Sequence, residues 1–177
     1  PFAYHVGVGG IIAGRTASEM PGLDIAEQRS WQNFLEAGLR LYGTLNRCLS
    51  EQHKLSLVDA RLLEILYRSE TGSARMGDLA EQLLSLPSRV TRQIRRLESG
   101  GMVQREASPD DGRGVLASIT DQGRMVVEEA LVTYATGVRE LYLGPLTRPQ
   151  MSGMGENCRR ISAALKNNGT AAKAGRT

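Results

Sequence analysis

The sequence has few of the residues that build disulfide scaffolds or metal centres. Only two of its 177 residues are cysteine, two are histidine and 5% are aromatic. Two cysteines are too few for a disulfide-stapled secreted domain, and Cys48 and Cys158 lack the spacing of a zinc site. His5 and His53 are the only histidines, so they offer little for metal sensing. We therefore expect neither a metal nor a cofactor.

Long apolar runs are also missing. No segment approaches the roughly 20 apolar residues that a membrane-spanning helix needs. The start of the chain does not resemble a signal peptide, because glycines at positions 7, 9, 10 and 14 interrupt its short apolar part. We expect residues 1–22 to form a disordered extension and the protein to be cytoplasmic.

Catalytic patterns are absent as well. The sequence contains no P-loop, no dinucleotide fingerprint and no nucleophile paired with a base. The adjacent acids Glu128 and Glu129 fall in a predicted helix, where consecutive side chains diverge and make a poor acid–base pair. The sequence therefore predicts a protein that is not an enzyme.

What the chain does have is a local concentration of arginine. With 41% hydrophobic residues it can form one domain with its own core, and its net charge is only +3. The positive charge gathers in one short region, whereas many of the acids lie elsewhere. Such a patch on an otherwise balanced chain fits phosphate binding. The arginines of this region are Arg89, Arg92, Arg95, Arg96, Arg105 and Arg113.

The central part of the chain has the pattern of a helix-turn-helix followed by a hairpin. Ser56 and Asp59 form a capping-box pattern that predicts a helix ending near Arg68. A short helix over 76–83 is followed by a second helix over 86–99, for which Ser85 is the N-cap candidate. Two short strands, 102–106 and 115–119, flank turn residues at 108–112. This order predicts a winged helix-turn-helix.

Helical geometry divides the second helix into an inner and an outer face. Val90, Ile94 and Leu97 recur at steps of four and three and should point inward, while Ala80 lets the first helix approach. The exposed N-terminal part of the helix should read base edges, and its later arginines should bind phosphates. A solvated basic face is the alternative. The predicted base readers are Ser88, Arg89, Thr91 and Arg92, and the predicted phosphate ligands are Arg95 and Arg96.

The hairpin tip carries the other predicted DNA contact. Arg113 could enter a minor groove, where narrow A·T-rich stretches concentrate negative potential. Asp111 would be repelled by phosphate, so we expect it to pair with an arginine and hold the wing in place. An ordinary acidic turn is the alternative.

Both ends of the chain carry long helices with apolar stripes. In the predicted helix 26–49, Trp31, Leu35 and Tyr42 belong to a four-and-three repeat. A helix capped at Thr120 should end at Gly144-Pro145, and Thr147 with Gln150 should open the last helix. The stripe of that last helix and the stripe of the first should pack together and against a second subunit. Its members are Met151, Met154, Cys158, Ile161 and Leu165.

These motifs resemble the MarR family of bacterial transcriptional regulators. The resemblance runs from about Trp31 to Leu165 and rests on segments 79–83, 88–92 and 97–103, on the wing signature at 111–113, and on 119–123. Residues 84–86 depart from the family, in which a glycine or small residue is frequent at the turn. The resemblance implies a homodimer on a palindromic DNA operator, with half-sites about one helical turn apart.

The resemblance also implies release from DNA by small aromatic acids or by cysteine oxidation. Arg40 or Arg61 could meet a carboxylate in a crevice near the dimer helices, although core packing of the aromatic residues is the alternative. Cys48 and Cys158 could sense oxidants if their thiols were accessible; otherwise they are small apolar fillers. The effector-binding candidates are Trp31, Phe34, Tyr42, Arg61, Tyr67 and Tyr134.

The predicted fold is mainly α with a small β-hairpin wing (α+β). One domain should span 23–167, with the winged helix-turn-helix at 56–119, dimerisation helices at 24–55 and 120–167, and a disordered tail at 168–177. The expected function is that of a dimeric repressor on double-stranded DNA. A redox-sensing regulator and a winged-helix module that binds protein are the alternatives.

Overall fold

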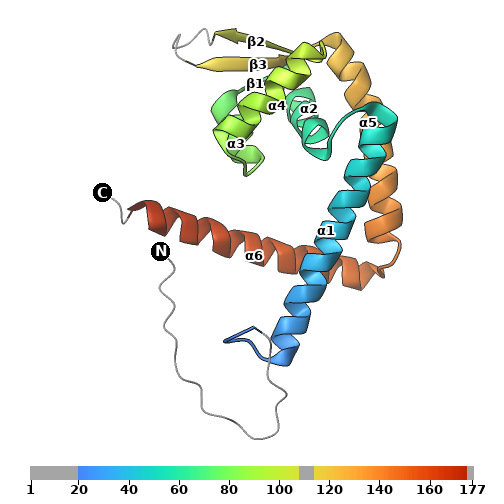
Figure 1. Ribbon diagram of the computed structural model, residues 1–177, viewed down its shortest axis with the longest axis vertical. Helices are drawn as coiled ribbons and strands as arrows, with labels where there is room; N and C mark the ends of the chain where they lie inside the picture. Colours follow the sequence, from blue (N-terminus) through green and yellow to red (C-terminus); the bar gives the residue numbers. More distant parts are fainter. Residues whose placement is uncertain (1–19, 108–113, 175–177) are drawn as a thin grey trace, which may run out of the picture. The chain divides into compact units, whose positions relative to one another are not determined.

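The computed structural model describes residues 20–107 and 114–174 (Figure 1), with side chains described as far as residue 166. The chain divides into two units, residues 1–40 and 41–177, and each is described by itself. The division falls within helix α1 (Ile25–His53). The sequence pattern predicts one domain from residue 23 and does not indicate this division.

The first unit contains the N-terminal part of α1. Asp24 and Glu27 start the helix as a capping box: the Glu27 amide donates to Asp24 Oδ1 at 2.9 Å, and the Asp24 amide donates to Glu27 Oε2 at 2.8 Å. This signal stands in the sequence, yet the predicted start was Ala26. Trp31 and Phe34 follow one turn apart, with ring centroids 6.1 Å apart, and both rings are about half exposed.

The second unit is built around helix α2 (Leu57–Arg68). Its predicted capping box is confirmed, because Ser56 and Asp59 bond reciprocally to each other's backbone amides. Leu62, Leu63 and Leu66 of this helix are fully buried. They pack in one core with the end of α1 and with the elements that follow α2.

The helix-turn-helix consists of α3 (Met76–Gln82) and α4 (Pro87–Ser99). The predicted interior is confirmed, since Ala80, Val90, Ile94 and Leu97 are all buried. The predicted N-cap is wrong: Leu86, not Ser85, is the N-cap of α4, and no side chain caps it. Pro87 occupies the first turn, where its fixed φ and missing N–H suit a helix start without a side-chain cap.

A three-stranded antiparallel sheet lies beside these helices in the order β1-β3-β2 (Figure 1). The strands are β1 (Ser73–Arg75), β2 (Val103–Ala107) and β3 (Val115–Ile119). The sequence pattern predicts the two hairpin strands but not β1. Its three residues pair with 116–118 of β3, and the Ser73 and Ser118 hydroxyls meet at 2.8 Å.

Helix α5 (Asp121–Val138) begins at the predicted cap, where the Thr120 hydroxyl accepts from the Gly123 amide at 3.0 Å. Gly123 is required here by a close approach, because a Cβ at this position would lie 2.2 Å from the Met102 carbonyl oxygen. A π-helical turn, η1 (Arg139–Leu143), follows α5, and the helical path ends at Gly144 as predicted.

Helix α6 (Arg148–Ala174) forms the C-terminal part of the chain. Only part of the predicted capping box forms, since Gln150 Oε1 accepts from both the amide and the hydroxyl of Thr147 at 2.9 Å. The helix continues past the predicted end at 167. Residues 170–174 include three alanines and a lysine, which are strong helix formers, so composition alone gave the wrong boundary for 168–174. Among the described residues, no helix is long and apolar enough to cross a membrane.

Candidate nucleic-acid interface

The outer face of α4 carries the predicted DNA-reading residues. Burial of Val90, Ile94 and Leu97 turns the opposite side of the helix to solvent. Thr91 is the half-buried member of the set, and its hydroxyl donates to the Pro87 carbonyl at 2.9 Å. The exposed members are Ser88, Arg89, Arg92, Arg95 and Arg96.

Three of these arginines have side chains that no described residue engages. Among residues 20–107 and 114–174, none forms a hydrogen bond or ion pair with the guanidinium group of Arg89, Arg92 or Arg95. A guanidinium group offers five N–H donors in a planar fork that matches a phosphate or a guanine edge. The three side chains therefore form an exposed cationic row along α4.

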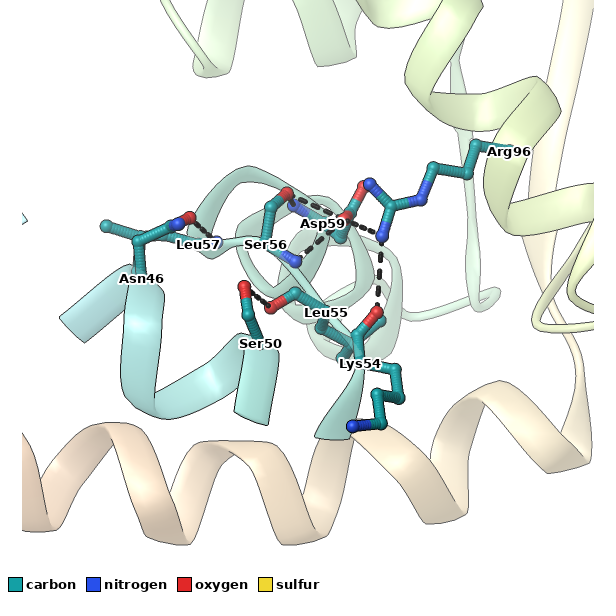
Figure 2. Close-up of polar contacts among 8 residues, drawn as sticks. All are labelled: Asn46, Ser50, Lys54, Leu55, Ser56, Leu57, Asp59 and Arg96. Atoms are coloured by element: carbon teal, nitrogen blue, oxygen red, sulfur yellow. Dashed lines mark hydrogen bonds and ion pairs between the residues drawn. The ribbon is translucent and has the colours of Figure 1, made fainter. Parts of the chain in front are cut away.

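Arg96 differs from its neighbours because it bonds within the chain. Its Nη2 lies 3.2 Å from Asp59 Oδ2 of α2 and donates to the Lys54 carbonyl oxygen at 3.2 Å (Figure 2). The sequence pattern predicts Arg96 as a phosphate ligand. It does not reveal the pair with Asp59, because the two residues belong to different helices far apart along the chain.

The wing is anchored to the end of α4. Arg105 of β2 forms a salt bridge with Glu98, at 2.6 Å from Nη2 and 2.8 Å from Nε, and both side chains are about one-third exposed. Glu98 thus neutralises Arg105 and not one of the outer arginines of α4. Asp111 and Arg113 lie outside the described residues, so their predicted roles stay predictions.

The turn between α3 and α4 has an unusual backbone. Leu84 adopts φ +49°, in the left-handed region that favours glycine, and it is 88% exposed. The sequence departs from the MarR pattern at this turn. As a result, Leu84 occupies the left-handed position, where a glycine or small residue is frequent in the family. The turn keeps its hydrogen bonds, since the Ser85 amide donates to the Ala80 carbonyl at 3.0 Å.

One of the effector candidates of the second unit lies at a cavity. Arg61 lines a cavity of about 610 Å³ formed by residues of α2, β1 and α3, together with Glu64 and Arg68. The buried Glu64 carboxylate pairs with both arginines; its Oε1 lies 3.0 Å from Arg68 Nη2. None of the three predicted tyrosines of the second unit, Tyr42, Tyr67 and Tyr134, lines this cavity.

The predicted aromatic residues differ in their surroundings. Trp31 and Phe34 belong to the first unit, where Arg40 pairs with Glu36, and Tyr42 is 49% exposed. The other two tyrosines pack against the core. Tyr67 donates to Glu128 Oε1 at 2.8 Å, and this hydrogen bond raises the pKa of the phenol. Tyr134 is half-buried.

The remaining sensor candidates are the two thiols. Cys48 and Cys158 are free and partly buried. Among the described residues no group of three potential ligands could hold a metal ion.

Comparison with known proteins places this helix-turn-helix in a family. The family whose sequence model matches is the MarR family, over residues 55–115. The DNA complex of Sco3205, a MarR family transcriptional regulator from Streptomyces coelicolor, superposes with a TM-score of 0.78 at 32% identity, covering 81% of this chain and 93% of that one. The chain belongs to the MarR family.

Two further relatives are consistent with this assignment. AbsC, a MarR family transcriptional regulator from Streptomyces coelicolor, has a TM-score of 0.78 at 28% identity, with 82% and 97% coverage. The HTH-type transcriptional repressor MdtR of Bacillus subtilis is 29% identical over 103 residues, which are 58% of this chain and 66% of MdtR. The chain spans between 41% and 66% of the length of the first curated relatives it matches. All these relatives are named as regulators, in agreement with the expectation of a protein that is not an enzyme.

Proposed function

We propose that the chain is a dimeric DNA-binding transcriptional regulator that represses from a palindromic operator and is released by a small effector. The observation that carries this proposal is the exposed row of Arg89, Arg92 and Arg95 on the second helix of the helix-turn-helix. No described residue neutralises this row. Sco3205, at 32% identity, was solved in complex with DNA, which supports the same use of this surface.

The positions of the three arginines suggest a division of roles. Arg89 and Arg92 lie in the first half of α4, the part that enters the major groove in helix-turn-helix proteins. A bidentate contact to guanine is worth about 1–3 kcal/mol of discrimination against a wrong base. Arg95 lies one turn further along and is better placed for a phosphate, whose contact contributes affinity without base preference.

The dimer is supported by apolar side chains that one chain leaves uncovered. Met154, Ile161 and Leu165 of α6 are 39%, 51% and 66% exposed. Trp31, Phe34 and Leu35 of α1 are between 42% and 49% exposed. Exposed apolar surfaces of this kind usually mark a protein–protein interface. A two-fold axis through such an interface would present two copies of α4 to half-sites about one helical turn apart.

The test is DNA binding measured as a function of salt. A labelled fragment carrying the region upstream of the coding sequence should bind with nanomolar affinity, and binding should weaken steeply between 50 and 200 mM salt, by roughly 10³-fold or more. Arg92→Ala should weaken binding at least tenfold. Arg139→Ala removes the same charge from an exposed position outside α4 and should change affinity less than twofold.

Binding of a protein partner with no affinity for DNA in the wild type would contradict the proposal and favour a winged-helix interaction module. If Arg92→Ala and Arg139→Ala changed DNA affinity equally, α4 would not form the DNA interface.

The proposed effector is a small organic acid. The cavity of about 610 Å³ supports this class, because Arg61 and Arg68 line it and each uses only part of its donor set on Glu64. A panel of aromatic carboxylates should release the operator, and Arg61→Ala should raise the concentration required. If peroxide releases the operator instead, and Cys48→Ser or Cys158→Ser prevents it, the regulator senses oxidation.

A further inference from the structure

Asp59 is a fully buried carboxylate with more than one task. Its Oδ2 accepts from the Ser56 amide at 2.8 Å and from the Ser56 hydroxyl at 2.6 Å (Figure 2). Arg96 Nη2 approaches the same oxygen to 3.2 Å. The residue is 0% exposed, and its Oδ1 is buried without a hydrogen-bond partner.

A capping box alone does not require this burial. The N3 residue of a capping box reaches back to the N-cap amide and can do so with its second oxygen in water. Burying a carboxylate with an unsatisfied oxygen is costly unless a cation compensates it. Arg96 is the only cationic side chain that forms an ion pair with Asp59 among the residues that the structure describes. The pair with α4 is therefore part of what keeps Asp59 in this position.

The same arginine nitrogen also contacts the end of α1. Arg96 Nη2 donates to the carbonyl oxygen of Lys54 at 3.2 Å. Lys54 directly follows α1 and takes up the left-handed φ of +59°, which redirects the chain toward α2. One guanidinium group thus bonds to residues on both sides of the α1–α2 connection.

Other bonds stiffen this connection. The Leu57 amide donates to Asn46 Oδ1 at 2.9 Å, and the Ser50 hydroxyl donates to the Leu55 carbonyl at 3.2 Å (Figure 2). Arg96 therefore joins α4 to a connection that already has several internal hydrogen bonds.

Two directional contacts hold α4: Glu98 near its end pairs with Arg105 of β2, and Arg96 bonds to α2 and to the end of α1. Val90, Ile94 and Leu97 bury its inner face, but apolar contact is non-directional. A charge-assisted hydrogen bond is strong and directional. The bonds of Arg96 to two acceptors constrain how α4 turns and slides, and hence where Arg89 and Arg92 point.

We propose that Asp59 and Arg96 form a positioning pair for DNA binding, in which Arg96 orients α4 through Asp59 and the Lys54 carbonyl and does not itself bind phosphate. This inference rests on the proposed function and changes the role that the sequence pattern predicts for Arg96. It also assigns a role in DNA binding to Asp59, whose acidic side chain is wholly buried.

Salt dependence separates the two roles of an arginine. Each phosphate contact contributes about one unit to the slope of log affinity against log salt concentration. A phosphate ligand that is removed lowers this slope, whereas a lost positioning contact weakens binding with the slope unchanged. Arg95 is the matched comparison, because it is the adjacent residue and no described residue pairs with its guanidinium group.

The experiment measures operator affinity at several salt concentrations for Arg96→Gln, Asp59→Asn, the double variant and Arg95→Gln. Arg96→Gln and Asp59→Asn should each weaken binding by about tenfold without changing the slope. The double variant should be no worse than either one, since the two side chains act as a unit. Arg95→Gln should lower the slope by about one.

Arg96→Lys keeps the inference testable should Asp59→Asn fail to fold. A lysine keeps the charge but has no planar fork with which to bond Asp59 and the Lys54 carbonyl together. A positioning arginine predicts that lysine restores little of the lost affinity, whereas a phosphate ligand predicts that it restores most of it. A slope lowered by about one in Arg96→Gln, or additive losses in the double variant, would overturn the positioning role alone. Absence of salt-sensitive operator binding by the wild type would overturn the proposed function and this inference together.

Discussion

Leucine side chains differ in burial between the helix-turn-helix core and the stripes of the terminal helices. Leu79 of α3 and Leu97 of α4 are fully buried, whereas Leu35 of α1 is 42% exposed and Leu165 of α6 is 66% exposed. Full burial of a leucine contributes about 1.5–3 kcal/mol. The core therefore gains this free energy in the fold of the second unit, while the exposed stripe residues gain it only on packing against another apolar surface. The two regions should respond differently to substitution.

The largest expected effect is in the core, at Gly123. Gly123→Ala places a Cβ 2.2 Å from the Met102 carbonyl oxygen and 2.8 Å from Ile119 Cγ1, so the start of α5 must move away from the strands. We expect a loss of about 3 kcal/mol in the free energy of unfolding, the upper part of the range for overpacking. Urea denaturation followed by circular dichroism measures it.

Gly77→Ala is the matched control for this substitution. Gly77 is an exposed residue of α3, and a Cβ there would meet nothing within 4 Å. Because alanine favours helix over glycine by up to about 1 kcal/mol, this variant should be as stable as the wild type or more so. Equal destabilisation by both substitutions would show that the contact with Met102 is not the cause.

The next effect concerns the stripe of α6. Ile161 is 51% exposed, and Ile161→Glu places a charge in the proposed dimer interface. We expect the dimer dissociation constant to rise by about 10- to 100-fold, because the charge would have to be desolvated on association. Sedimentation over a range of concentrations measures it.

Ser162→Glu introduces the same charge at the next residue, which lies about 100° around the helix and outside the stripe. It should leave the dimer intact. At protein concentrations low enough to dissociate the dimer, the free energy of unfolding of the helix-turn-helix core should be the same in both variants. Weakening of the dimer by Ser162→Glu alone would place the interface on another face of α6.

Local patterns predicted much of this fold, and non-local contacts account for most of what they missed. The stripe of Val90, Ile94 and Leu97 and the caps at Ser56 and Thr120 are short-range signals, and all are confirmed. Strand β1 has only three residues and forms by pairing with β3. It is too short for an alternating hydrophobic pattern to predict it.

The candidate site shows the same limit. The exposure of Arg89, Arg92 and Arg95 follows from helical geometry once the inner face is known. The bonds of Arg96 depend on where Asp59 and Lys54 lie in space, and the sequence pattern does not contain that information. The wing residues Asp111 and Arg113 remain predictions.

The smallest expected effect is a gain in stability at the turn between α3 and α4. The left-handed φ of Leu84 costs an L-residue roughly 1–2 kcal/mol, while glycine adds about 0.5–1 kcal/mol of backbone entropy cost on folding. Because Leu84 is 88% exposed, Leu84→Gly loses little burial. The free energy of unfolding should rise by about 0.5–1 kcal/mol, measurable as a higher urea midpoint.

Leu39→Gly makes the same chemical change in the interior of α1, where the backbone is helical and 64% of the leucine is exposed. With no strain to relieve, the entropy cost of glycine inside a helix should lower stability by about 0.5–1 kcal/mol. Opposite signs for the two variants would assign the effect to the backbone of Leu84, and equal signs would exclude that explanation. If Leu84→Gly gains stability but binds the operator more weakly, the exposed leucine contributes to DNA binding and the strained turn is retained for that contact.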